Sequence, residues 1–186
     1  MFSNDIPLGL KKITTSVYKV DRDIVRDCVV TQEMLCFIQN ECKSLELQRC
    51  RINCHSSDEA SVHEMFLAFT NASTIVPHTH LDKSESFFIL KGKVGIAILD
   101  SNKPLIKRIV ILDALNGPVY TCVKAGLCHL VLSLSPVSLV HEITSGPFVK
   151  DAAVIPQWAL DPILGSANIS KLKQEMTNCH GSFRSK

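Results

Sequence analysis

Short runs of apolar and β-branched residues, separated by turn residues, dominate the middle of the chain. They lie at residues 65–70, 87–90, 93–99, 105–112, 119–123, 130–134 and 139–143. Runs of this length and composition predict strands, and the turn residues between them predict antiparallel connections. Residues 100–104 and 134–137 are each expected to form a hairpin turn. This rhythm is typical of an antiparallel sandwich, so the predicted fold class is all-β.

Helical spacing is found on both sides of the predicted strands. Thr31 is a typical N-cap. The apolar residues that recur after it at steps of three and four are Met34, Leu35, Ile38, Cys42 and Leu45. They predict a helix over residues 31–46 that packs on the barrel or on a second subunit. An early strand containing Ile13 and Val17 and a short helix over residues 166–176 are also expected.

Length and composition favour one globular domain with additions at both ends. The chain has 186 residues, of which 46% are hydrophobic, and its 20 basic and 18 acidic residues nearly balance. The expected division is an N-terminal strand and helix extension over 1–50, a barrel over 51–160, and a C-terminal extension with a polar tail over 161–186. The sequence has no basic stripe, so nucleic acid is not expected as a partner. No apolar run approaches the roughly 20 residues of a membrane span.

Eight cysteines are present, but no two have the Cys-x-x-Cys spacing. Reduced and mostly buried thiols are therefore expected, in place of a disulfide scaffold or a structural zinc site. The N-terminus lacks a basic start followed by an apolar core, so a cytosolic location is expected.

Three histidines and one glutamate have the spacing of a metal site. His78 and His80 are one residue apart, Glu85 follows after a short turn, and His129 opens a later apolar strand. Successive side chains of a strand point to opposite faces, so His78 and His80 lie on one face and Thr79 points away. The sequence thus predicts a centre with three imidazoles and one carboxylate.

This donor set favours a divalent Fe, Mn, Co, Ni or Zn ion, and the lack of a thiolate argues against a structural zinc site. Four protein ligands leave positions of an octahedral ion open to oxygen atoms of water or a substrate. The apolar residues expected to face inward and give the site dry walls are Phe87, Ile89, Val131, Met65 and Leu67. Lys83 lies in the turn between His80 and Glu85, where it can meet an anionic group or donate a proton.

The spacing of the ligand residues resembles the two sequence motifs of the cupin superfamily. His78, His80, Glu85 and Gly92 match every gap of the first motif, while Gly126 and His129 match the second. Lys124 and Ser133 stand where the second motif usually has proline and asparagine. Neither position is a ligand. The resemblance implies a jelly-roll barrel, also called a double-stranded β-helix.

Residues flanking the motifs are similar to the WbuC family of cupin metalloproteins. They are Arg51, Asn53, His55 and Asp58 before the barrel, and Glu142, Gly146, Pro147 and Phe148 near its end. This resemblance covers roughly residues 49–160. It implies a homodimer, often found with surface polysaccharide genes. It also implies that Arg51, Asn53 and Glu142 bind substrate and that His55 lines the site.

Two classes of function remain open. In the first the protein is an enzyme that isomerises or epimerises a small sugar-like substrate, with Lys83 or His55 as acid or base. An Fe(II) dioxygenase is a further enzymatic alternative. In the second class the protein binds a small molecule through its metal, for sensing, without turnover. His63 and His141 fit no ligand spacing and are interpreted as ordinary histidines.

Overall fold

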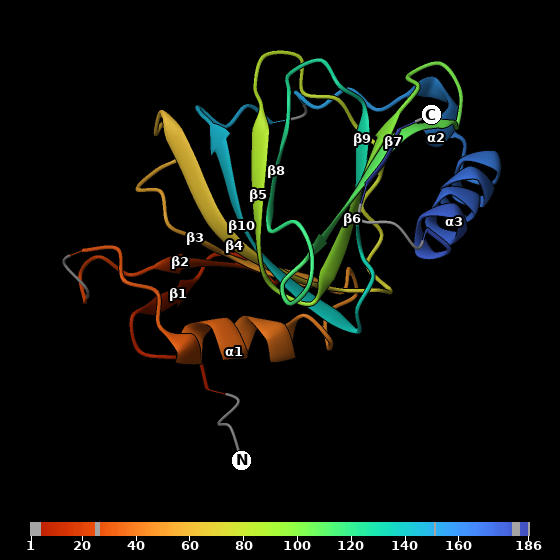
Figure 1. Ribbon diagram of the computed structural model, residues 1–186. Coiled ribbons are helices and arrows are strands. Elements are labelled where there is room, and N and C mark those ends of the chain that lie inside the picture. Colours follow the sequence, from red (N-terminus) through yellow and green to blue (C-terminus); the bar gives the residue numbers. More distant parts are fainter. Residues whose placement is uncertain (1–4, 25–26, 151, 180–182, 186) are drawn as a thin grey trace.

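The computed structural model describes residues 5–24, 27–150, 152–179 and 183–185. Two sheets face each other to form a barrel, and one helix covers the outer side of each sheet (Figure 1). In the described ranges, no helix is both long enough and apolar enough to cross a membrane. The all-β jelly-roll fold predicted from the sequence is confirmed.

The first sheet has seven strands in the order β1-β2-β3-β4-β10-β5-β8. Their bounds are Leu10–Lys12 (β1), Val17–Val20 (β2), Arg49–Asn53 (β3), Val62–Thr70 (β4), Val137–Ser145 (β10), Glu85–Lys91 (β5) and Tyr120–Val123 (β8). The second sheet has the order β11-β7-β6-β9, with bounds Phe183–Ser185, Ile106–Asp113, Lys93–Leu99 and His129–Ser133. All neighbouring strands are antiparallel except β2 and β3, which are parallel.

The strands expected over residues 65–143 are all present, and residues 100–104 join β6 to β7 as a hairpin. The hairpin expected at residues 134–137 is wrong. Strand β9 pairs with β6 in the second sheet, whereas β10 lies between β4 and β5 in the first. The turn therefore carries the chain across the barrel. Ser138 Oγ, which donates to the carbonyl oxygen of Lys93 at 2.8 Å, helps to hold this crossing in place.

Helix α1 (Gln32–Glu41) has the predicted cap, because Thr31 Oγ1 accepts a hydrogen bond from the backbone N–H of Met34 at 3.3 Å. Its buried stripe packs on the outer face of the first sheet. The helix and its C-terminal end contribute Met34, Leu35, Ile38 and Cys42 to this core. The sheet contributes Tyr18, Cys50, Ile52, Ala68 and Leu139. The barrel, and not a second subunit, covers the stripe.

The second outer core lies between the second sheet and α3 (Leu164–Thr177), which follows the short α2 (Gln157–Leu160). Leu172 and Met176 of α3 pack against Leu130 and its neighbours, as the predicted helix over 166–176 requires. Of the predicted polar tail, residues 180–182 and 186 lie outside the described residues, and β11 pairs with β7. The third core fills one part of the barrel interior, and both polar and apolar residues line the two cavities beside it.

Candidate metal centre

Backbone pairing brings the two predicted halves of the centre together. The N–H of His129 donates to the carbonyl oxygen of His78 at 2.9 Å, and the N–H of His78 donates to that of His129 at 3.1 Å. His129 begins β9 of the second sheet and Glu85 begins β5 of the first. The centre therefore lies where the two sheets meet. Thr79 pairs with Val154 on the other side of its segment, so the expected alternation of side chains is present.

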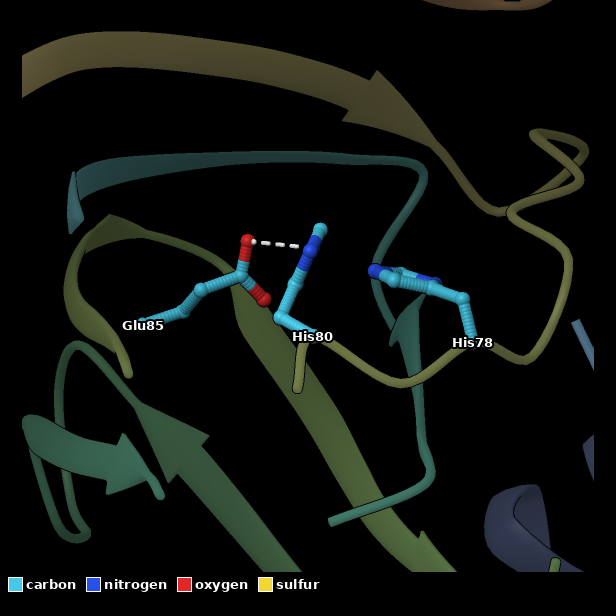
Figure 2. A group of neighbouring side chains, drawn as sticks. All are labelled: His78, His80 and Glu85. Carbon is cyan, nitrogen blue, oxygen red and sulfur yellow. Dashed lines mark ion pairs between the residues drawn. The ribbon is translucent and has the colours of Figure 1, made fainter. Parts of the chain in front are cut away.

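His78, His80 and Glu85 form a group whose potential ligand atoms all lie within 4.8 Å of one another. Figure 2 shows the imidazole of His80 beside the carboxylate of Glu85, with the ring of His78 directed toward the same space. Glu85 Oε1 is 3.1 Å from His80 Nε2, and Glu85 Oε2 is 2.9 Å from His129 Nε2. The carboxylate thus contacts two imidazoles from different parts of the chain.

The tautomers of two histidines follow from their backbone contacts. His78 Nδ1 lies 2.9 Å from the carbonyl oxygen of Val76, and His129 Nδ1 lies 3.1 Å from that of Leu127. A carbonyl oxygen only accepts hydrogen bonds, so Nδ1 carries the proton in both rings. In the neutral form of either ring, the lone pair is therefore on Nε2. Such a contact at the far nitrogen is the usual way in which proteins orient a metal-binding histidine.

The Nε2 lone pairs of His78 and His129 are suited to bind a cation. His129 Nε2 is buried and makes no aligned hydrogen bond, although Glu85 Oε2 is only 2.9 Å away. A lone pair facing a carboxylate oxygen at this distance is repulsive unless a proton or a metal ion lies between them. Imidazole and carboxylate ligands suit divalent Fe, Mn, Co, Ni and Zn. The residues therefore fit a transition metal, although they do not identify it.

Electrostatics keep the centre ready for a cation. Burial opposes ionisation of Glu85, but in the metal-free protein hydrogen bonds from His129 and His80, which require a proton on each Nε2, outweigh burial and hold the pKa of the carboxyl well below its usual range. Burial, together with the neighbouring His129, lowers the pKa of His78 to about 4. At neutral pH, Glu85 is ionised and His78 is neutral. Both states are the ones in which these groups bind metals.

Two cavities adjoin the centre inside the barrel, with volumes of about 330 Å³ and about 340 Å³. Val17, Arg51, Glu85 and Glu142 line both of them. The other residues around the first cavity are Ser16, Leu47, Arg49, Cys50, Leu67, Ile75, His78, Phe87, His129 and Val131. Those around the second are Ile13, Thr14, Asn53, His55, Asp58, His63, Met65, His80, Lys83, Thr144 and Phe148. Glu85 thus lies at the boundary between the two cavities.

All the site residues named from the sequence lie around these two cavities. Arg51 and Glu142 border both, whereas Asn53, His55 and Lys83 border only the second. Of the expected apolar walls, Phe87, Val131 and Leu67 line the first cavity and Met65 the second. Ile89 is buried in the core of the barrel.

Glu142 has an unusual environment for a carboxyl group. It lies on β10 opposite Met65 and Phe87, and burial together with the charge of Glu85 raises its pKa to about 7. The positive charges of Arg51 and Lys83 oppose this rise only in part. A carboxyl with a pKa near neutrality can give and take protons at physiological pH.

His63 and Arg49 are among the cavity residues that sequence reasoning missed. His63 stacks on His55 with ring centroids 4.0 Å apart, and it lines the second cavity. Arg49 lines the first cavity. Arg49 lies two residues before Arg51 on β3, so strand alternation alone was a usable signal for it. No local pattern singled out His63, since its contact with His55 depends on the pairing of β3 with β4.

Comparisons with known proteins agree with the fold. A family model described as a domain of unknown function (DUF6016) matches residues 30–111, which is less than half of the chain. No curated protein matches the sequence. Among solved structures, protein SO0799 from Shewanella oneidensis has a TM-score of 0.51 at 12% identity, covering 69% of this chain and 85% of its own.

Solved structures of cupins are also among the matches. A cupin superfamily protein from Desulfitobacterium hafniense matches at 16% identity with a TM-score of 0.43, covering 58% of this chain and 86% of its own. KdgF from Halomonas sp. matches at 16% identity with a TM-score of 0.42, covering 55% and 82%. Of these three matches, only SO0799 has a TM-score above 0.5, and at 12% identity it bears on fold alone. Strand pairing and the candidate His-His-Glu site define a jelly-roll protein with a possible metal centre, and the WbuC resemblance stays a prediction.

Proposed function

We propose that this chain is a metal-binding cupin in which His78, His80, Glu85 and His129 hold one divalent transition metal ion. The observation that carries the proposal is the convergence of His78, His80 and Glu85 within 4.8 Å, beside the buried Nε2 of His129, which lies 2.9 Å from Glu85 Oε2. A bound cation would take the place of a proton between that nitrogen and the carboxylate. Its identity within the Fe, Mn, Co, Ni and Zn group is left to metal analysis.

We propose further that the protein is an enzyme acting on a small sugar-like substrate by isomerisation, epimerisation or a related proton transfer. A bound metal would polarise a carbonyl or hydroxyl oxygen of the substrate. Cavities of about 330 Å³ and 340 Å³ are in the size range of small-molecule sites. The buried Oδ1 of Asn53 has no hydrogen-bond partner among the described residues, so it is available to accept a substrate hydroxyl.

Proton transfer falls to side chains of the second cavity. Glu142 borders both cavities, and in the metal-free protein its pKa is raised to about 7, so we propose it as a group that gives or takes a proton. His55 donates from Nδ1 to the carbonyl oxygen of Glu64 at 3.2 Å, and burial and the neighbouring His63 lower its pKa. Its Nε2 therefore carries a lone pair and suits a base. Lys83, which lines the second cavity, is the candidate proton donor.

Metal content tests the first step. We expect the wild-type protein, purified without added metal, to contain close to one equivalent of a transition metal. The substitutions His78→Ala, His80→Ala and His129→Ala should each remove most of it, because an incomplete ligand set binds weakly. His141→Ala is the matched control, since His141 stacks on Phe66 and borders neither cavity. Stoichiometric metal in all three ligand variants would refute the assignment.

A ligand screen tests the second step. Sugars and nucleotide sugars that bind the folded protein raise its thermal stability by mass action. Ligands that stabilise only the metal-loaded protein are then assayed for conversion. Turnover that disappears in Glu142→Gln, with metal retained, would support the enzyme. Binding with no conversion would instead place the chain among the non-catalytic binding proteins.

We propose further that the protein is a cytosolic homodimer. We expect reduced thiols, and hence a reducing compartment such as the cytosol, because no two cysteines of the sequence have the Cys-x-x-Cys spacing. The resemblance to cupins favours a homodimer, and the near balance of charges argues against nucleic acid as a partner. Light scattering of the purified protein would measure a monomer mass if the dimer is wrong.

A further inference from the structure

Strand β3 separates its side chains by chemistry to an unusual degree. Cys50 and Ile52 are buried in the core beneath α1, and Cys50 also borders the first cavity. Arg49, Arg51 and Asn53 alternate with them and border the cavities of the barrel. Three consecutive inward positions of one strand are therefore polar, and two are cationic. Apolar residues would normally occupy such positions in a sheet that faces a core.

Arg49 and Arg51 lack a fixed counter-charge. Within the described ranges, neither guanidinium has a carboxylate within 4.0 Å. Arg51 Nε is buried and makes no hydrogen bond. Glu142 is close enough for the charge of Arg51 to affect its pKa, but it does not form an ion pair with that residue. Both arginines line the first cavity, and burial, and secondarily the charge of Arg51, lowers the pKa of Arg49.

Both arginines line the first cavity together with His78, Glu85 and His129. A molecule in this cavity can therefore touch the metal centre and the guanidinium groups at the same time. Guanidinium groups present planar sets of N–H donors that match carboxylate and phosphate oxygens. Buried donors without partners are costly, so an anion that satisfies them is strongly favoured.

We propose that Arg49 and Arg51 form an anion subsite, and that the molecule recognised at the metal centre is a small polyhydroxylated acid carrying a carboxylate or a phosphate. The inference rests on the proposed function for the position of the metal, and it narrows the substrate class from sugars in general to anionic ones. Hydroxyl or carbonyl oxygens of the same molecule would face the His and Glu side chains. The oxyanion would lie against β3.

Matched pairs of ligands test the subsite by titration calorimetry on the manganese-loaded full chain. The anions are D-glucuronate, D-glucose 6-phosphate and D-glycerate, and their neutral counterparts are D-glucose and glycerol. We expect at least one anion to bind about tenfold or more tightly than its neutral counterpart, since charge-assisted hydrogen bonds are the stronger kind. Preference for glucuronate or glycerate would identify a carboxylate, and preference for glucose 6-phosphate a phosphate.

Substitutions of the two arginines test whether these residues cause the preference for anionic ligands. Arg49→Met and Arg51→Met should each reduce it about tenfold or more while leaving metal content unchanged, and Arg51→Lys should restore part of it. Arg108→Met is the control, because Arg108 lies on β7 and borders neither cavity. Anions that bind no better than their neutral counterparts to the wild-type protein would overturn the proposal. Unchanged affinity in both β3 variants would do the same.

The same titrations in EDTA separate this inference from the proposed metal centre. The arginines do not depend on the metal, so the wild-type protein should keep a measurable preference for the anion in EDTA. Protein that never binds metal but still prefers anions would refute the metal centre and leave the subsite standing. Protein that binds metal but shows no anion preference would refute the subsite alone. The comparison of ligands on the wild-type protein does not depend on how well any variant folds.

Discussion

Ionisation of the buried Glu142 should destabilise the folded protein as pH rises. Burial and the charge of Glu85 raise its pKa from the ordinary 4.5 to about 7 in the folded protein. Below pH 4.5 the carboxyl is protonated in both the folded and the unfolded chain, so it has no effect. As pH rises from 4.5 to 7, the unfolded chain loses the proton first, and the folded state becomes progressively less stable. Above pH 7 the loss is constant.

At about 1.4 kcal/mol per pH unit, this difference destabilises the metal-free protein by roughly 3 kcal/mol above pH 7. Glu142→Gln removes the ionisation while keeping nearly the same shape. We therefore expect the advantage of the variant over the wild type to grow by about 2 to 3 kcal/mol between pH 5 and pH 8. Using the change between two pH values cancels any constant effect of the amide on packing or hydrogen bonding.

Urea unfolding in EDTA at pH 5 and pH 8 measures both free energies of unfolding. EDTA is needed because a bound cation would stabilise an ionised Glu142 and reduce the effect. Glu64→Gln is a matched control, since Glu64 lies on β4 outside both cavities and is about half exposed. It should change little between the two pH values. If the difference between wild type and Glu142→Gln is the same at pH 5 and pH 8, the reasoning is wrong.

Three further outcomes are expected. Gly92 and Gly126 share a φ of 79°. A Cβ added at Gly92 would lie 2.8 Å and 2.9 Å from atoms of β10, whereas a Cβ added at Gly126 would meet nothing within 4 Å. In urea unfolding, Gly126→Ala should cost about 1 kcal/mol and Gly92→Ala about 1 to 3 kcal/mol more; equal costs would argue against the clash. Ile38→Ala, at a fully buried position of α1, should cost about 2 to 4 kcal/mol by the same assay, whereas Ile163→Ala, at a position 80% exposed, should stay within about 0.5 kcal/mol. Lys83→Met should keep the fold and the metal but weaken ligand binding or turnover, and wild-type affinity and rate in this variant would return Lys83 to the surface.

The sequence by itself determined the parts of the site that depend on neighbouring residues. Alternation along a strand placed His78 and His80 together and turned Thr79 away, and both results hold in the structure. The cap at Thr31 and the apolar stripe of α1 were equally local. These features follow from the pleat of a strand and the turn of a helix, which repeat every two and 3.6 residues whatever the rest of the chain does.

Only the tertiary structure decided which distant segments meet. Residues 134–137 have the composition of a hairpin turn, yet they cross between sheets because β10 pairs with β4 and β5 while β9 pairs with β6. Arg49 and His63 join the cavities because β3 pairs with β4 and with the parallel β2. Such pairings are selected by the burial of whole faces and by loop closure over long separations. A local pattern of residues therefore does not specify them.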